Sequence, residues 1–202
     1  MKQPLINSRN HGFGLIEILI TLLVFSIGVL AVAGLQALSK KNNYDALQRT
    51  TAAGLAESIV ASMRANPRAR DAYITGTGSP IGSNGTSQAP ANCYQAACDP
   101  QDMAAFDLYV WEQGLNGAGE ILVLDGDAIE TGGLVNPSAC ILGPADGSAG
   151  FYQVVIAWRG VTKLGEAQNH SCGAGRGLYD TGDAADNASY QRFFVLRTFI
   201  GQ

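Results

Sequence analysis

The chain has 202 residues and a mass of 21.1 kDa, a size that suits one domain with one appended element rather than a multidomain enzyme. Apolar residues make up 47% of it and charged residues only 15%, against about 25% charged in an average soluble domain. The formal net charge is -4, and no basic cluster interleaved with aromatic residues occurs. This composition excludes intrinsic disorder and argues against nucleic acid as a partner.

The excess of apolar residues lies near the N-terminus. Residues 18 to 39 form a run of 22 without a charge, long enough to cross a hydrocarbon core of about 30 Å at about 1.5 Å per helical residue. Lys2, Arg9 and His11 precede the run, and no acid occurs before Glu17. Because positive charge is retained on the cytoplasmic side, we expect everything after residue 38 to be exported.

Glu17 distinguishes this run from an ordinary secretory signal. Residues 31 to 33 (Ala-Val-Ala) do fit a signal-peptidase site, so one alternative is a soluble periplasmic binding domain released after Ala33. A cleaved signal has no use for a carboxylate, however, which costs several kcal/mol in lipid unless it is neutralised or paired. The apolar character also continues to Leu38. We therefore favour a membrane segment that is retained.

A helical pattern continues beyond this segment. The apolar side chains expected on one face of residues 44 to 66 are Leu47, Leu55, Ile59 and Met63, flanked by Ala52, Ala56 and Val60. Pro67 ends the pattern, because the residue before a proline is displaced from the α region. We predict one helix from Phe13 to about Ala65, with its second half covered by a sheet of the same chain.

A second helix is predicted after a loop at residues 75 to 92, which is rich in Gly, Ser, Thr, Asn and Pro. Asp99 is a suitable N-cap, Pro100 suits the first turn and Asp102 favours a helix N-terminus. Asn116-Gly117 closes the helix. The side chains predicted to face inward are Met103, Phe106, Val110 and Trp111.

Strand patterns occupy much of the remaining chain. Residues 151 to 158 alternate most clearly, residues 190 to 200 less so, and residues 139 to 142 and 121 to 124 are shorter candidates. Residues 165 to 189 are predicted to be a loop tied down by Cys172. The expected class is α+β: one long N-terminal helix packed on the small antiparallel sheet of a globular head, with one extra helix and long loops.

Four cysteines, Cys93, Cys98, Cys140 and Cys172, all follow the membrane segment. An even number in an oxidising compartment indicates two disulfides. Three connectivities are possible, and we favour Cys93 with Cys98 and Cys140 with Cys172. The Cys-x4-Cys spacing does not match a metal site, and no histidine lies nearby.

Neither catalysis nor a cofactor is expected. After residue 12 the only histidine is His170, in a Gly-rich stretch, so a nucleophile and base pair would depend on that single residue. Asp180, Asp183 and Asp186 are spaced by three, unlike the alternating ligands of a calcium loop. We predict a solvated turn there and no metal site.

Charge is distributed unevenly. Residues 71 to 158 contain ten carboxylates and no Lys or Arg, whereas residues 40 to 70 contain six cations and two acids. The favoured interpretation is a solvated acidic face. The alternative is that the basic stretch attracts the acidic part of the same molecule or of a neighbour.

The sequence Gly12-Phe13-Gly14-Leu15-Ile16-Glu17, followed by the apolar run, resembles the N-terminal signature of type IV prepilins. The resemblance implies a basic leader at residues 1–12, cut after Gly12 by a prepilin peptidase that methylates the new amine of Phe13. It also implies a long helix at residues 13–66, spanning the membrane at about 13–38, and a head at 67–202. Gly14 departs from the family, which more often has Ser or Thr. In the family, the acid at the position of Glu17 pairs with the N-terminal amine of an adjacent subunit.

Two head segments carry a narrower resemblance. Residues 98 to 108 with Trp111 and Leu115, and the strand at residues 154 to 160, resemble minor pilins of the PilV type. This implies a low-copy subunit that primes or modifies pilus assembly, near the tip in the family's filaments. Its partners would be other minor and major pilins, prepilin peptidase and the inner-membrane assembly machinery. It would lie in inner-membrane lipid with a periplasmic head before entering the extracellular pilus. The alternative is a minor pseudopilin of a type II secretion system, which shares the leader and the helix.

Overall fold

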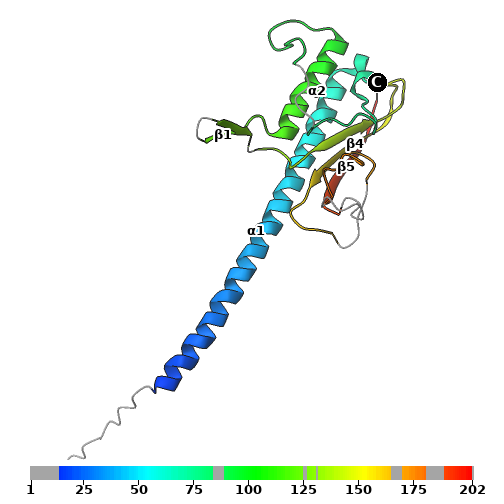
Figure 1. Cartoon of the computed structure of the whole chain (residues 1–202). Helices are drawn as coiled ribbons and strands as arrows, with labels where there is room; N and C mark the ends of the chain where they lie inside the picture. Colours follow the sequence, from blue (N-terminus) through cyan, green and yellow to red (C-terminus); the bar gives the residue numbers. More distant parts are fainter. Residues whose placement is uncertain are drawn as a thin grey trace, which may run out of the picture. The chain divides into compact units, whose positions relative to one another are not determined.

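The computed structural model describes residues 14–83, 89–124, 127–130, 132–164, 170–180 and 189–201. Its elements in chain order are α1 (Leu15–Ala65), two single-turn 3-10 helices (Pro67–Ala69 and Asp71–Tyr73), α2 (Pro100–Asn116), β1 (Ile121–Leu124), β2 (Asp127–Glu130), β3 (Ser138–Leu142), β4 (Gly150–Arg159) and β5 (Gln191–Ile200). The chain divides into two compact units, residues 1–43 and 44–202. The class is α+β with one long N-terminal helix, as predicted (Figure 1).

The described part of the first unit consists of Gly14 and the first stretch of α1. Every residue from 14 to 43 is exposed, so no side chain of the described residues covers this stretch. The hydroxyls of Thr21 and Ser26 donate to the helix carbonyls of Ile18 and Leu22, at 2.9 and 2.7 Å. Since these polar groups are satisfied within the helix, they are compatible with an apolar environment.

The second unit is built on a three-stranded antiparallel sheet in the order β3-β4-β5. One face of the sheet packs on the second half of α1. The buried side chains that meet there include Ala52, Ala56, Ile59, Val60 and Met63 from α1 and Tyr152, Val154, Ile156 and Trp158 from β4. The two alanines have no bulk beyond Cβ, which lets the helix backbone approach the large side chains of β4.

The helix α2 lies beside α1 and follows the predicted boundaries. The Asp99 carboxylate accepts the Asp102 N–H at 2.8 Å, and Gly117 ends the helix at a φ of 81°. A Cβ on Gly117 would lie 1.9 Å from the carbonyl oxygen of Gly132, so only glycine fits this turn. The Trp111 indole donates to the Leu55 carbonyl at 2.9 Å, which fixes α2 against α1.

Two predicted core positions are wrong. Leu47 is 60% exposed and Val110 is 38% exposed. In α1 the neighbouring Gln48 is buried instead, because its amide donates to the Gly133 carbonyl and accepts the Val135 N–H, at 3.0 and 3.1 Å. In α2 the buried positions are Ala104, Phe106, Trp111, Glu112 and Leu115, and Met103 is half-buried.

Residues 121 to 124 form a strand, as predicted, but they pair with β2 and not with the main sheet. The sequence analysis did not identify β2. The hairpin of β1 and β2 stands apart from the three-stranded sheet in Figure 1. The predicted loop after α1 contains one isolated bridge, between Ile81 and Ala139.

Tyr73→Phe is expected to lower the free energy of unfolding of the head by about 1 to 3 kcal/mol. Tyr73 is fully buried, and its hydroxyl donates to the Asp107 carboxylate and accepts from the Asn66 amide. Burial, with the bond to Asp107, raises the pKa of this phenol, so it stays protonated as a donor at neutral pH. The substitution leaves Asp107 without that donor. Denaturant unfolding of the full chain in detergent measures the loss.

The matched control is Tyr109→Phe. Tyr109 is half-buried on the same helix as Asp107, and its hydroxyl makes no hydrogen bond to the described residues. A loss of stability in Tyr109→Phe as large as that in Tyr73→Phe would contradict the role assigned to the Tyr73 hydroxyl.

Candidate assembly interface

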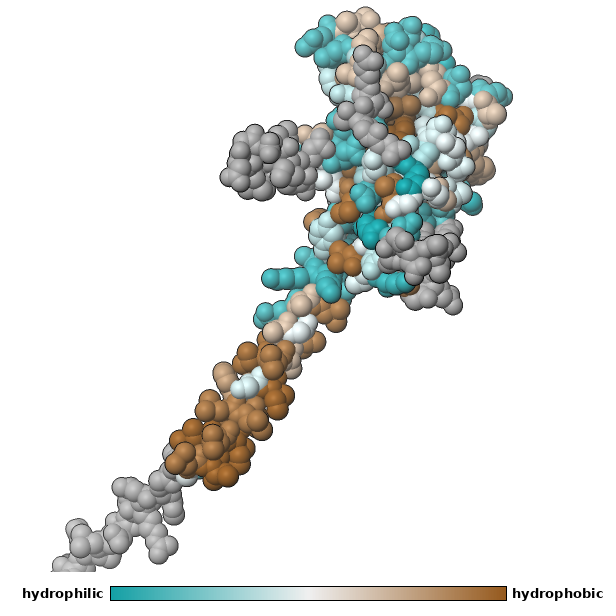
Figure 2. Space-filling model, viewed as in Figure 1, coloured by the Kyte–Doolittle hydropathy of each residue, from teal (hydrophilic) through white to brown (hydrophobic). Residues whose placement is uncertain are grey.

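The first stretch of α1 exposes large apolar side chains along its length, and the face of it seen in Figure 2 is mostly brown. This apolar segment, residues 15 to 38, belongs to the one described helix that is long and apolar enough to cross a membrane, and an 18-residue stretch of that helix has a mean hydropathy of 2.7. Its exposed large side chains include Leu15, Ile16, Leu19, Leu23, Phe25, Leu30 and Leu35. An apolar surface of this extent marks a membrane or protein contact.

Glu17 is the only ionisable residue of the apolar segment. It lies in the first turn of α1, where its N–H donates to the Gly14 carbonyl at 3.0 Å and its side chain is exposed. A carboxylate is favoured there by the helix dipole. No described residue supplies a cation to it. The predicted processing residues, Gly12 and Phe13, lie outside the described residues.

A shallow groove crosses the apolar segment near Gly28. It is lined by Phe25, Gly28, Val29, Val32, Ala33 and Gln36. A Cβ added to Gly28 would meet nothing within 4 Å, so no contact described in this chain requires glycine there. Small residues on an apolar helix let a second helix approach closely. The groove is therefore accessible to a second helix.

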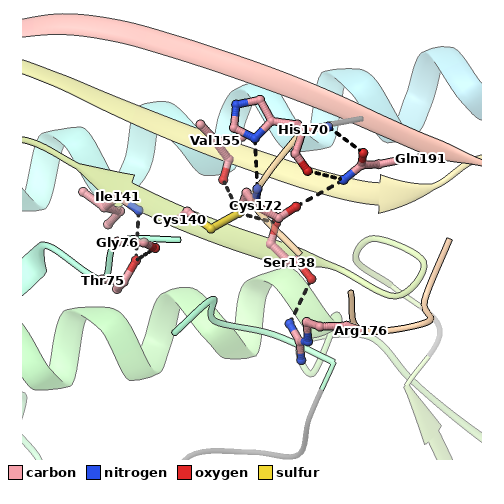
Figure 3. Close-up of a disulfide and its surroundings, with 10 residues drawn as sticks. All are labelled: Thr75, Gly76, Ser138, Cys140, Ile141, Val155, His170, Cys172, Arg176 and Gln191. Carbon is pink, nitrogen blue, oxygen red and sulfur yellow. Dashed lines mark hydrogen bonds between the residues drawn. A yellow bond between two sulfur atoms is a disulfide. The ribbon is translucent and has the colours of Figure 1, made fainter. Parts of the chain in front are cut away.

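In the head, the structure contains the two disulfides that the sequence favoured, Cys93–Cys98 and Cys140–Cys172. Figure 3 shows the second, which joins β3 to the loop at residues 170 to 180 on the face of the sheet away from α1. Both of its sulfurs are fully buried with Val155. Cys172 therefore ties down residues 170 to 180 of the predicted loop, and residues 165–169 and 181–188 of that loop lie outside the described residues.

Polar side chains hold the same loop. The Gln191 amide donates to the carbonyls of His170 and Cys172, at 3.3 and 3.1 Å, and accepts the His170 N–H at 2.9 Å. The Arg176 guanidinium donates to Ser138 Oγ and to the Gly82 carbonyl, both at 2.9 Å. The middle of this sheet face is therefore covered.

Among the described residues, no nucleophile is paired with His170. Its Nδ1 accepts the Cys172 N–H at 3.1 Å, and burial lowers the pKa of the imidazole. Among the described residues, no group of three His, Cys, Asp or Glu side chains could hold a metal ion. Of the carboxylates weighed for calcium, Asp180 is half-buried, and Asp183 and Asp186 lie outside the described residues.

Two family models match the chain. A model described as type IV pilin Tt1218 matches residues 34–109, and a model of the prokaryotic N-terminal methylation motif matches residues 7–33. No curated protein and no solved structure matches it. The two matched ranges adjoin, and together they cover the apolar segment, the rest of α1 and the first part of α2.

The fold and the apolar segment define a class of protein in which a long apolar helix carries a small α+β head. The chain is a type IV pilin-like protein. Pilins are structural subunits, and the methylation motif implies assembly with other pilins and processing by a prepilin peptidase.

Proposed function

We propose that the chain is a minor pilin that primes or modifies the assembly of a type IV pilus, near its tip. Prepilin peptidase cuts it after Gly12 and methylates Phe13. The protein is held in the inner membrane by residues 13 to 38, with the head at 67–202 in the periplasm, until the assembly machinery moves it into the filament. Its partners are other minor and major pilins, and it has no cofactor and catalyses no reaction.

One observation carries this proposal: the exposed apolar segment contains a single carboxylate in its first turn. Lipid alone would cover the apolar side chains but would leave Glu17 uncompensated at a cost of several kcal/mol. A neighbouring subunit that presents its freed N-terminal amine at this level supplies both an apolar helix surface and the missing cation. The same pair sets the register of one helix against the next.

The head supports the minor role. Residues 98 to 108 resemble minor pilins of the PilV type. They include Cys98, which is bonded to Cys93, the N-cap Asp99 and the first half of α2. In the second matching segment, Val154, Ile156 and Trp158 are part of the head core. Both segments therefore build the head that a minor pilin presents to its neighbours.

Mass analysis of the mature N-terminus tests the processing step. The proposal expects a chain that begins at N-methylated Phe13. A chain that begins at Gly34 would mean cleavage by signal peptidase after Ala33, and it would overturn the proposal in favour of a released periplasmic domain.

Proteomics of sheared pili tests the filament role. The protein should be present at low copy number in wild-type pili, and its deletion should reduce the number of filaments. If the protein is processed at Phe13 but is absent from pili, and the filament number is unchanged on deletion, a minor pseudopilin of a type II secretion system replaces the minor pilin.

A further inference from the structure

The two edges of the three-stranded sheet differ. On the β3 edge, Ala139 exchanges two backbone hydrogen bonds with Ile81, at 2.8 and 2.9 Å, and the Ile141 carbonyl accepts from Thr75 and Gly76. The Ile141 N–H donates to the Thr75 hydroxyl at 3.0 Å, and Figure 3 shows this contact near the disulfide. This edge is therefore closed by the chain's own loop.

Among the described residues, no strand pairs with the outer edge of β5, which is ten residues long. The backbone groups of β5 point alternately to β4 and away from it. Which residues point to β4 follows from the pair just before the strand, where the Gly160 N–H donates to the Tyr190 carbonyl at 2.8 Å. Even-numbered residues direct their backbone groups to β4, and odd-numbered residues direct theirs outward. In the described chain, no partner is found for the outward N–H groups, which belong to Phe193, Val195, Arg197 and Phe199. An open edge of this length is a template for an added strand.

Exposed aromatic side chains lie beside the open edge. Phe151 and Phe199 are directly paired across β4 and β5, with ring centroids 5.5 Å apart, and they are 78% and 56% exposed. They line a groove of about 660 Å³ together with Leu142, Gly143 and Arg197. The described part of the loop fastened by Cys140–Cys172, residues 170 to 180, covers the middle of this sheet face and does not cover Phe151 or Phe199. Clustered aromatic and arginine side chains are typical of the residues that dominate binding between proteins.

The charge of β5 indicates what kind of strand it accepts. The strand contains Arg192 and Arg197 and no acid. Arg197 is exposed, and its Nε donates to the Gln153 side chain at 3.0 Å, which leaves the terminal nitrogens of the guanidinium able to meet a carboxylate. Pairing of β5 with β5 of a second copy would gather four arginines along one seam. The complement is a strand that carries carboxylates.

We propose that β5 accepts an extended, carboxylate-bearing segment of a neighbouring pilin head as a fourth strand of the sheet. Backbone hydrogen bonds to the outward groups of residues 193 to 199 hold the segment, Phe151 and Phe199 bind its apolar side chains, and Arg197 pairs with its carboxylate. This partner assignment rests on the proposed function, because it requires a neighbouring pilin subunit.

Photocrosslinking in pilus-producing cells tests the assignment. Phe199 of the full chain is replaced by p-benzoylphenylalanine, a change that keeps the aromatic ring, and the crosslinked peptide is identified by mass spectrometry. We expect an adduct with a segment of another pilin-type subunit that contains Asp or Glu. An adduct that joins β5 to β5 of a second copy, or an adduct with lipid only, would overturn the proposal.

Two further substitutions in the crosslinking chain separate docking from folding. Arg197→Glu reverses the charge, and Val195→Pro removes an outward N–H that β4 does not use. Each should lower the adduct yield at least about threefold, while the amount of protein and both disulfides stay unchanged. Arg68→Glu, at an exposed arginine just after α1, is the matched charge control and should have no effect.

The outcomes distinguish this proposal from the proposed function. A protein absent from sheared pili would contradict the minor-pilin assignment itself. A protein present in pili that gives no adduct from Phe199, or an adduct that neither substitution changes, would contradict only the docking at β5.

Discussion

Replacing Glu17 by valine is expected to leave the protein processed and in the membrane but to reduce its incorporation into pili by about 100-fold or more. In a filament of packed apolar helices, the freed amine of Phe13 from a neighbouring subunit loses its carboxylate. Breaking a buried ion pair by removing one member costs about 3 to 5 kcal/mol, which is two to more than three powers of ten in an equilibrium constant. Quantitative immunoblots of sheared pili and membranes measure the ratio.

The control for this substitution is Glu57→Val. Glu57 is the other acid of α1 that is exposed, and it lies in the second half of the helix, outside the apolar segment. If both variants enter pili equally well, the acid of the apolar segment has no special part in assembly. Equal exclusion of both would point to a general effect of acid removal on the helix.

The elements that follow from local chemistry could be predicted with their boundaries. Pro67 restricts the residue before it, and α1 accordingly ends at Ala65. Asp99, Pro100 and Gly117 each act within one turn of α2, and that helix spans Pro100–Asn116. The strict alternation of residues 151 to 158 likewise predicts β4, because the period of a strand is set by its own backbone.

The positions that were wrong depend on contacts distant in sequence. An apolar period cannot reveal that Gln48 is buried, because its amide is satisfied by backbone groups 85 and 87 residues away. Arg70 is likewise buried, and its guanidinium donates to the carbonyls of Ile200 and Gly201. Such side chains are polar in sequence and buried in structure, and no local pattern marks them.

Of the candidate interface, only the apolar segment with Glu17 could be predicted from the sequence. A carboxylate inside an apolar run conflicts with the membrane whatever the fold of the head, so Glu17 could be singled out directly. The alternation of β4 predicts two faces, but it does not say where each is covered. That depends on where the Cys140–Cys172 disulfide fastens its loop, so the exposed Phe151 and Phe199 emerge only from the structure.

Replacing both Cys140 and Cys172 by serine is expected to lower the free energy of unfolding of the head by about 3 to 4 kcal/mol. The disulfide closes a loop of 32 residues, and the loss of that constraint on the unfolded chain accounts for most of the effect. The native state also suffers, because two serine hydroxyls replace sulfurs that are fully buried beside Val155. Denaturant unfolding of the full chain in detergent measures the change.

The double substitution Cys93→Ser and Cys98→Ser is the matched control. The disulfide that it removes joins residues only five positions apart, and both cysteines are half-buried. The same chain-entropy argument therefore gives a loss in the free energy of unfolding of about 2 kcal/mol or less. In the Cys140 and Cys172 double variant, hydrogen bonds from Gln191 and Arg176 still connect residues 170 to 180 to the sheet, so β4 should stay folded. Limited proteolysis should nevertheless cut residues 170 to 180 faster than in the wild type, because the covalent link is lost. Equal losses of stability in the two double variants would contradict the assignment of Cys140–Cys172 as the main covalent constraint of the head.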